Sequence, residues 1–228
     1  LKRDFDLLNS KNTEVYVIPM GFDWNLSPQE ATFYRQFTTD FFDLLISLGG
    51  DDLHPKLYNQ SNSQAKNVHL DRDLTEYHLV KHYKENSKGI FLGICRGHQL
   101  SAVVDGYELI QDLGEVHDNC LVRHQKMIDN KPEYLYHEII MQPSLISRLF
   151  GFKDNLTRRI IVNSFHHQAV KKCNTVKNFC VAYDTEHEII EALVTRDSKS
   201  ISVQFHPVLP NEINKNQEFT ELGHKFIY

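Results

Sequence analysis

The sequence has no excess of basic charge and no long apolar run. Its 228 residues include 25 lysines and arginines against 30 aspartates and glutamates, which gives a formal net charge of -5. Paired basic residues such as Lys2-Arg3 and Lys171-Lys172 are scattered, so we expect no nucleic-acid partner. No apolar run approaches the roughly 20 residues that cross a bilayer, and we expect no membrane segment.

Cysteine is scarce, with only Cys95, Cys120, Cys173 and Cys180. None of them forms a CxxC pair, and their spacings match no zinc module. The chain shows no signal peptide, so we expect reduced thiols in a cytoplasmic protein. We also expect no metal and no cofactor.

The chain does have enough apolar material for a sizeable core. Hydrophobic residues make up 41% of it, with 14 phenylalanines and 10 tyrosines. No linker, low-complexity run or internal repeat divides it, so we predict one domain over residues 1–228. Leu1 is not a start methionine, and we expect further residues before it.

Strands and helices alternate in the first half of the chain. The predicted elements are a buried strand over Val15–Pro19, a helix from a capping box at Ser27–Glu30 to about Phe37, a strand over Leu44–Leu48, a loop over 51–70, a helix capped by Asp73–Glu76 and ending near Asn86, a strand over Gly89–Ile94, and a helix over about Gly97–Val104. This alternation predicts an α/β fold, a mostly parallel sheet with helices on both faces.

The second half adds strands, which we expect to pair antiparallel. They are predicted over Tyr107–Gln111, Glu138–Met141, Arg159–Ser164, Phe179–Tyr183, Glu188–Thr195 and Ile201–His206, before a last helix over about Glu218–Tyr228.

A cysteine version of the nucleophile elbow lies between the predicted strand and helix, at Gly93-Ile94-Cys95-Arg96-Gly97. Glycines two residues before and after the nucleophile remove side chains that would clash in a strained turn. We expect an exposed thiol whose pKa is lowered by the helix N-terminus, with the N–H of Arg96 directed at a developing oxyanion. The alternative is a buried cysteine in an ordinary βα turn.

A cysteine nucleophile needs a base, and His206 is the best placed of 13 histidines. It ends a predicted strand and precedes Pro207, at the edge where open α/β sheets place their sites. The alternative is a surface histidine at a strand end.

Two other histidine pairs have spacings found in metal sites. The tandem pair His166-His167 has no third ligand indicated nearby. His78 and His82 lie four residues apart on a predicted helix, which suits half a metal site or a solvated helix face.

Three segments in this order, Gly93–Gln99, Val162–Gln168 and Val203–Pro207, resemble class I glutamine amidotransferases. Within that superfamily the chain is most similar to the γ-glutamyl hydrolase-like peptidases, which include γ-glutamyl-γ-aminobutyrate hydrolases. Supporting stretches are Gly49–Tyr58, Asp71–Asp73 and Asp105–Asp112.

The resemblance implies a flavodoxin-like sheet and a Cys-His-Glu triad that hydrolyses a γ-glutamyl amide through a thioester. It makes Cys95 the nucleophile and His206 the base, with Gly50 and Arg96 as the N–H donors of the oxyanion hole. It also implies that Gln99 and the segment Ser164-Phe165-His166 hold the glutamyl group.

Two features depart from the family. The position of its triad glutamate is Val208 here, although Glu212 follows nearby. The family also has a strand before its first helix, whereas this chain starts near that helix, at Leu1–Leu8, so we expect that strand to precede Leu1.

Three functional hypotheses follow. The first is a stand-alone hydrolase of a small γ-glutamyl amide, either glutamine or a γ-glutamyl-amine conjugate. The second is a glutaminase subunit that delivers ammonia to a partner synthetase. The third is a binding module whose catalysis is weakened because Val208 replaces the acid.

Overall fold

The computed structural model describes residues 14–18, 27–116, 124, 126–128, 131–133, 135–171, 178–185 and 189–207. The predictions made for the last helix, Val208 and Glu212 therefore lie outside the described residues, as do those for Cys120 and Cys173.

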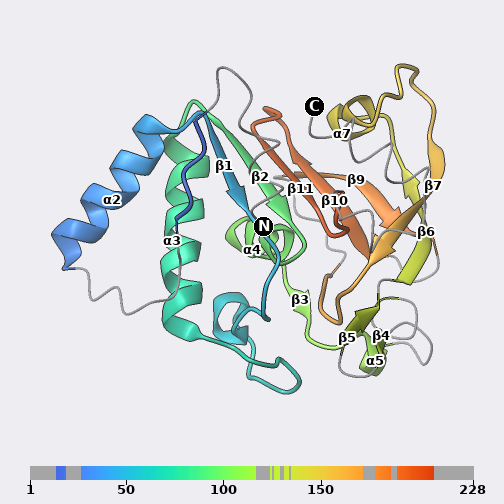
Figure 1. Ribbon diagram of the computed structural model, residues 1–228, viewed down its shortest axis with the longest axis horizontal. Helices are drawn as coiled ribbons and strands as arrows, with labels where there is room; N and C mark the ends of the chain where they lie inside the picture. The colour runs from blue at the N-terminus through green and yellow to red at the C-terminus, as the bar shows by residue number, and fades with distance from the viewer. Residues whose placement is uncertain are drawn as a thin grey trace.

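The sheet runs in the order β1-β2-β11-β10-β9-β6-β7, and β8 joins β3 to β10 (Figure 1). Its strands are β1 (Leu44–Ser47), β2 (Ile90–Ile94), β3 (Leu109–Ile110), β6 (Leu135–Met141), β7 (Arg158–Ser164), β8 (Ala169–Val170), β9 (Asn178–Asp184), β10 (Ile190–Thr195) and β11 (Ser200–Val203). A separate hairpin pairs β4 (Lys126–Ile128) with β5 (Lys131–Glu133).

Parallel pairing joins β1, β2 and β11, with Gly93 of β2 opposite Ser47 and Ser202. The other described pairs are antiparallel. The α/β class with added antiparallel strands is thus confirmed. Because parallel strands end at the same edge of a sheet, the residues that follow β1, β2 and β11 gather there.

The helices are α2 (Pro28–Phe41), α3 (Leu70–Asn86), α4 (Arg96–Val104), α5 (Leu113–Val116), α7 (Leu145–Leu149) and a 3-10 turn, η1 (Pro55–Tyr58). Helices α3 and α4 cover one face, where Tyr83 and Leu100 pack with Phe91 of β2. Ile146 of α7 packs into the core on the other face, with Val203 and Phe205. Among the described helices, none has both the length and the apolar character that a bilayer crossing needs.

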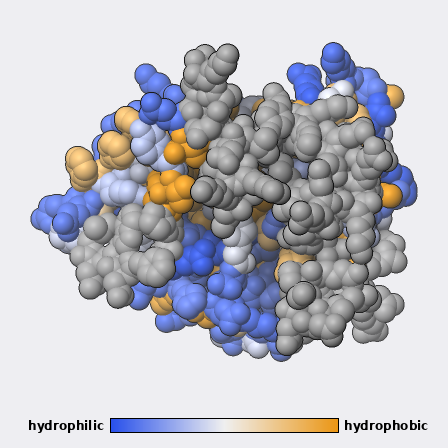
Figure 2. Space-filling view, viewed as in Figure 1, coloured by the Kyte–Doolittle hydropathy of each residue, from blue (hydrophilic) through white to orange (hydrophobic). Residues whose placement is uncertain are grey.

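Helix α2 begins as predicted. The hydroxyl of Ser27 accepts a hydrogen bond from the N–H of Glu30, whose carboxylate accepts one from the N–H of Ser27. The helix continues one turn beyond the predicted end and exposes a row of stacked rings, Phe33, Phe37 and Phe41. Apolar surface is visible along this side of the molecule (Figure 2).

Two local predictions are wrong. Residues 15–18 form no strand, and Tyr16 and Val17 are 54% and 66% exposed, so this short apolar run is not buried. Asp73 and Glu76 do not cap a helix, because α3 already begins at Leu70 and both carboxylates are buried within it. Their partner is Arg96, which no local pattern could indicate.

Backbone contact between α4 and the sheet explains the glycines of the elbow. A Cβ on Gly97 would lie 2.1 Å from the carbonyl oxygen of Ser47, and one on Gly93 would lie 2.6 Å from the carbonyl oxygen of Gly97. Both contacted atoms are backbone carbonyl oxygens, which cannot rotate away from an added methyl group as the end of a side chain could. These two glycines therefore let the helix lie directly against β1 and β2.

We predict that Gly97→Ala lowers the free energy of unfolding by about 3 kcal/mol, since the added methyl group meets main chain. Gly106 has a φ of 92° but open space around it, so the control Gly106→Ala should cost about 1 kcal/mol from backbone strain alone. Chemical denaturation of both variants measures the difference. Equal midpoints would show that α4 does not need this close approach.

Candidate active site

Cys95 lies at the turn between β2 and α4, as the elbow motif predicts. Its backbone is in an unusual conformation, with φ 54° and ψ -108°. Its N–H donates to the carbonyl of Val203 at 2.9 Å, which ties the turn to the end of β11. A non-glycine residue with positive φ is strained, and such residues cluster at functional sites.

His206 comes beside Cys95 at the same edge of the sheet. A Cβ placed on Gly49 would lie 3.2 Å from Cε1 of His206 and 3.8 Å from the sulfur of Cys95, so the two side chains flank this glycine. The histidine lies beyond β11, which ends at Val203, and not within it as predicted. Its position there is set by Asn163, whose amide donates to the His206 carbonyl and accepts from the His206 N–H, both at 2.8 Å.

The predicted exposed and ionised thiol is wrong. Cys95 is 7% exposed, and burial raises the pKa of its thiol to about 12. A hydrogen bond from the backbone of Arg96 acts in the opposite direction, and the negative charge of Glu191 raises the pKa further. Desolvation therefore outweighs the helix N-terminus on which the prediction was based.

Burial also lowers the pKa of His206, to about 4. A thiol and an imidazole with these pKa values are both neutral at neutral pH. The pair is thus suited to a proton transfer that accompanies attack, and not to a thiolate–imidazolium pair at rest.

Arg96 is the largest fully buried side chain among the residues that the structure describes. Its guanidinium donates to Asp73 at 2.5 Å and to Glu76. The other oxygen of Asp73 accepts from the N–H of His54 at 2.8 Å, in the loop after β1. A Cβ on Gly50 would lie 3.3 Å from Cδ of Arg96, so the two predicted oxyanion-hole residues are neighbours.

The residues predicted to hold the glutamyl group lie close together but bond to the protein itself. The amide of Gln99 donates to the carbonyl of Gln168 at 3.0 Å and to the side chain of Gln204 at 3.1 Å.

The hydroxyl of Ser164 donates to the carbonyl of His124 at 3.1 Å. Nδ1 of His166 donates to the carbonyl of Gln168 at 2.8 Å. The fourth residue, Phe165, is partly exposed beside them.

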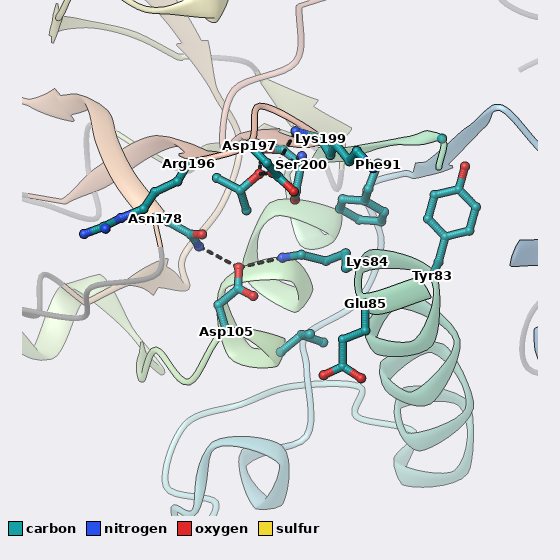
Figure 3. A pocket seen from close by; sticks show the side chains of 13 residues that line it. Tyr83, Lys84, Glu85, Phe91, Asp105, Asn178, Arg196, Asp197, Lys199 and Ser200 are labelled. Carbon is teal, nitrogen blue, oxygen red and sulfur yellow. Dashed lines mark hydrogen bonds and ion pairs between the residues drawn. The ribbon is translucent and has the colours of Figure 1, made fainter. Parts of the chain in front are cut away.

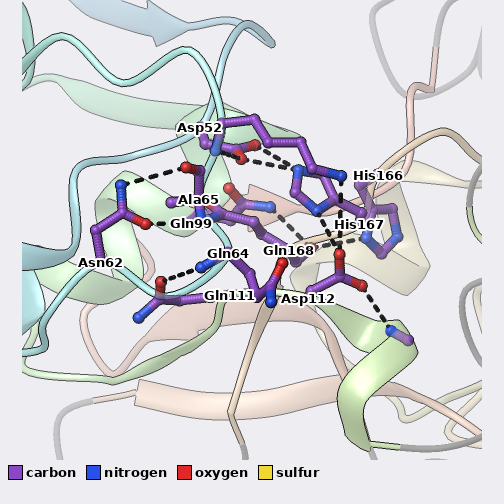
Figure 4. Close-up of polar contacts among 12 residues, drawn as sticks. Asp52, Asn62, Gln64, Ala65, Gln99, Gln111, Asp112, His166, His167 and Gln168 are labelled. Carbon is purple, nitrogen blue, oxygen red and sulfur yellow. Dashed lines mark hydrogen bonds and ion pairs between the residues drawn. The ribbon is translucent and has the colours of Figure 1, made fainter.

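The loop after β1 is fastened to this segment by His167 (Figure 4). Nε2 of His167 lies 2.8 Å and 3.0 Å from the carboxylate oxygens of Asp52, and Nδ1 lies 3.5 Å from Asp112. Asp52 also accepts from the N–H of Lys66 at 2.7 Å. The tandem histidines therefore point to different partners and do not share a ligand.

A surface cavity of about 360 Å³ lies at the opposite edge of the sheet (Figure 3). Phe91 and Ser200, the early residues of β2 and β11, line it, and Lys84 pairs there with Asp105 at 2.5 Å. Neither Cys95 nor His206 belongs to its lining. We place the candidate active site at the strained cysteine and not at this cavity, because the reactive groups define the chemistry.

Sequence reasoning missed Asn163, Glu191 and the pairing of His167 with Asp52. Asn163 stands inside the segment Val162–Gln168 that carried the family resemblance, so its position was a usable signal. Glu191 is a lone carboxylate in the apolar run of β10, and it is fully buried. A charged residue at such a position rarely lacks a role, but sequence alone does not indicate its partners.

Comparisons with known proteins identify the family of this chain. A family model described as Peptidase C26 matches residues 6–208. The chain is 33% identical over 195 residues to "Protein NtpR" of Enterococcus hirae, covering 84% of this chain and 76% of that protein. It is 30% identical over 166 residues to the "Putative glutamine amidotransferase-like protein YvdE" of Lactococcus lactis, covering 72% and 65%.

A solved structure supports the fold. The crystal structure of a "putative gmp synthase subunit a protein" from Thermoplasma acidophilum gives a TM-score of 0.53 at 17% identity. The match covers 86% of this chain and 76% of that one.

We predict an unusual pH dependence for alkylation of Cys95. Because its thiol has a pKa of about 12, the rate with iodoacetamide should rise about tenfold per pH unit from about pH 7 to pH 10. Free cysteine, the reference, should level off above its own pKa of about 8.5. Peptide mass spectrometry of quenched samples measures the rate at Cys95. A plateau below pH 8 would mean that the thiolate is stabilised at rest.

Proposed function

Because this chain belongs to the peptidase C26 family, we propose that it hydrolyses a γ-glutamyl amide bond, with Cys95 as the nucleophile and His206 as the base. The family and the glutamine amidotransferase-like relatives support amide hydrolysis in general. The γ-glutamyl substrate and the thioester are our proposal. The observation that carries it is a strained cysteine and a histidine on either side of Gly49.

In the proposed acylation, the sulfur of Cys95 attacks the amide carbon while its proton passes to His206. The carbonyl oxygen becomes an oxyanion, for which we propose the N–H groups of Gly50 and Arg96 as donors. The C–N bond then breaks and the imidazolium returns its proton to the leaving amine. A γ-glutamyl thioester and a free amine, or ammonia, result.

In the proposed deacylation, a water molecule gives a proton to His206 and attacks the thioester carbon. The C–S bond breaks, the thiolate recovers the proton from the imidazolium, and glutamate leaves. Each half of the cycle begins with a neutral imidazole, as the lowered pKa of His206 requires.

Asn163 is the positioning residue for the base in this proposal. A triad acid would orient the imidazole through its ring, whereas Asn163 fixes the backbone of His206 at both its N–H and its carbonyl. This anchoring suits a chain in which Val208 occupies the position of the acid. We further propose that Gln99, Ser164, Phe165 and His166 shape the wall beside the glutamyl group.

The first test is glutamate release from L-glutamine, γ-glutamyl-γ-aminobutyrate and γ-glutamyl-p-nitroanilide. We expect turnover of at least one of them, and a loss of about a thousandfold or more in Cys95→Ala, because the covalent route disappears. Cys180→Ala is the matched control, since Cys180 lies in β9 away from the elbow. Hydroxylamine should trap the thioester as γ-glutamyl hydroxamate. Turnover that persists in Cys95→Ala would refute the proposal.

The second test is Asn163→Ala. We expect kcat to fall by about 10- to 100-fold with little change in KM, because the base moves while substrate contacts remain. Ile161→Ala is the control, since Ile161 lies on the same strand with its side chain 50% exposed. Unfolding curves separate misplacement of His206 from loss of fold. An unchanged kcat in a folded Asn163→Ala variant would remove the positioning role.

A further inference from the structure

Three histidines and one glutamate meet in the protein interior beside the segment that carries His166. They are His124, His137 of β6, His166 after β7 and Glu191 of β10, and all four are buried. Nε2 of His137 lies 3.3 Å and Nε2 of His166 lies 4.0 Å from Oε1 of Glu191. The ring of His124 stands between the other two imidazoles, with centroids 4.4 Å and 4.9 Å away. We call these four residues the histidine cluster.

Hydrogen bonds fix two of the imidazoles in the form that a metal ligand needs. Nδ1 of His166 donates to the carbonyl of Gln168, so the lone pair of a neutral ring is on Nε2. The hydroxyl of Ser164 gives its hydrogen to the carbonyl of His124, so Nδ1 of His124 donates to that hydroxyl at 3.0 Å. Both rings thus have Nε2 as the acceptor atom, on the side of the cluster. An outer hydrogen bond that sets the tautomer in this way is typical of metal-bound histidines.

The centre of the cluster is short of hydrogen bonds within the described part of the chain. Both carboxylate oxygens of Glu191 and both ring nitrogens of His137 are buried without a hydrogen bond there. A buried carboxylate in this situation destabilises the fold unless a cation balances it.

We propose that the histidine cluster binds one divalent transition-metal ion, with zinc as the reference ion. One ring nitrogen each of His124 and His166 and a Glu191 oxygen lie within 4.8 Å of one another. His137, whose Nε2 lies 3.3 Å from Oε1 of Glu191, would supply the fourth ligand after a rotation of its ring. Two atoms that each lie about 2.1 Å from one ion are at most about 4.2 Å apart. The 3.3 Å and 4.0 Å separations from Glu191 already meet this limit, and a pair near 4.8 Å must shorten by side-chain rotation. Imidazoles with one carboxylate suit zinc and its neighbours.

The ion would have a structural role. Four protein ligands leave no open position for substrate, which is the pattern of structural zinc sites. The ligands join β6, β10 and the chain after β7. This inference does not depend on amide hydrolysis, and it makes His166 a metal ligand in the wall of the candidate active site. It also replaces the sequence-based expectation of no metal.

The test is the metal content of the full chain, produced in zinc-supplemented medium and freed of loosely bound ions. We expect about one equivalent of zinc per chain in the unaltered protein and at least a tenfold lower content in Glu191→Gln and His137→Gln. His78→Gln is the control, since His78 is an exposed histidine on α3, and it should keep its zinc. Cobalt introduced in place of zinc should give the visible absorption of a four-coordinate site with nitrogen and oxygen ligands.

A second measurement keeps the test decisive if those variants do not fold. A strong chelator should lower the melting temperature of the unaltered protein, and added zinc should restore it, because an ion that binds only the folded state stabilises it. Zinc content below a tenth of an equivalent, with no thermal shift on adding zinc or cobalt, would overturn the proposal. Equal zinc loss in His78→Gln would also overturn it. Glutamate release is measured separately, so failure of the metal site and failure of the hydrolase remain distinguishable.

Discussion

The contact between the main chain of α4 and the strands beneath it determines the rest of the candidate active site. Gly93 and Gly97 allow an approach that no side chain would tolerate, and the turn between them forces Cys95 to a positive φ. The sulfur at this turn is buried. An exposed thiol at the same place would be solvated, and the helix N-terminus would favour its thiolate. Close packing therefore sets the geometry of the proposed nucleophile, and burial keeps its thiol neutral.

Arg96 shows how the protein accommodates charge next to this thiol. Its guanidinium is buried and paired with the carboxylates of Asp73 and Glu76. These two negative charges offset most of the effect that the positive charge of Arg96 would have on the thiol. Glu191 lies nearby and acts in the opposite direction on Cys95. The thiol thus lies in a field of little net positive charge, which agrees with the proposed transfer of its proton to His206 during attack. Buried pairs of this kind specify geometry more than they stabilise the fold.

Sequence reasoning succeeded where the cause is local. The capping box at Ser27 and the two glycines of the elbow are short patterns whose physical reasons lie within a few residues. It failed where the cause is distant in sequence. Asp73 looked like a cap because its partner Arg96 belongs to another element, and the raised pKa of Cys95 reflects burial by many segments. The ligands proposed for the metal have no common spacing, so only the fold brings them together.

The link between His167 and Asp52 has a consequence for how this scaffold could diversify. The imidazole of His167 holds the loop that follows β1 through Asp52. A change in that loop would therefore shift the neighbouring His166 in the wall of the candidate active site. If the proposed hydrolysis holds, a new preference for the leaving amine would require paired substitutions, one in the loop and one in the tandem histidines. A single substitution, either in the loop or in the tandem histidines, would break the contact between His167 and Asp52 without creating a new pocket. Closely related chains should accordingly vary these positions together or not at all.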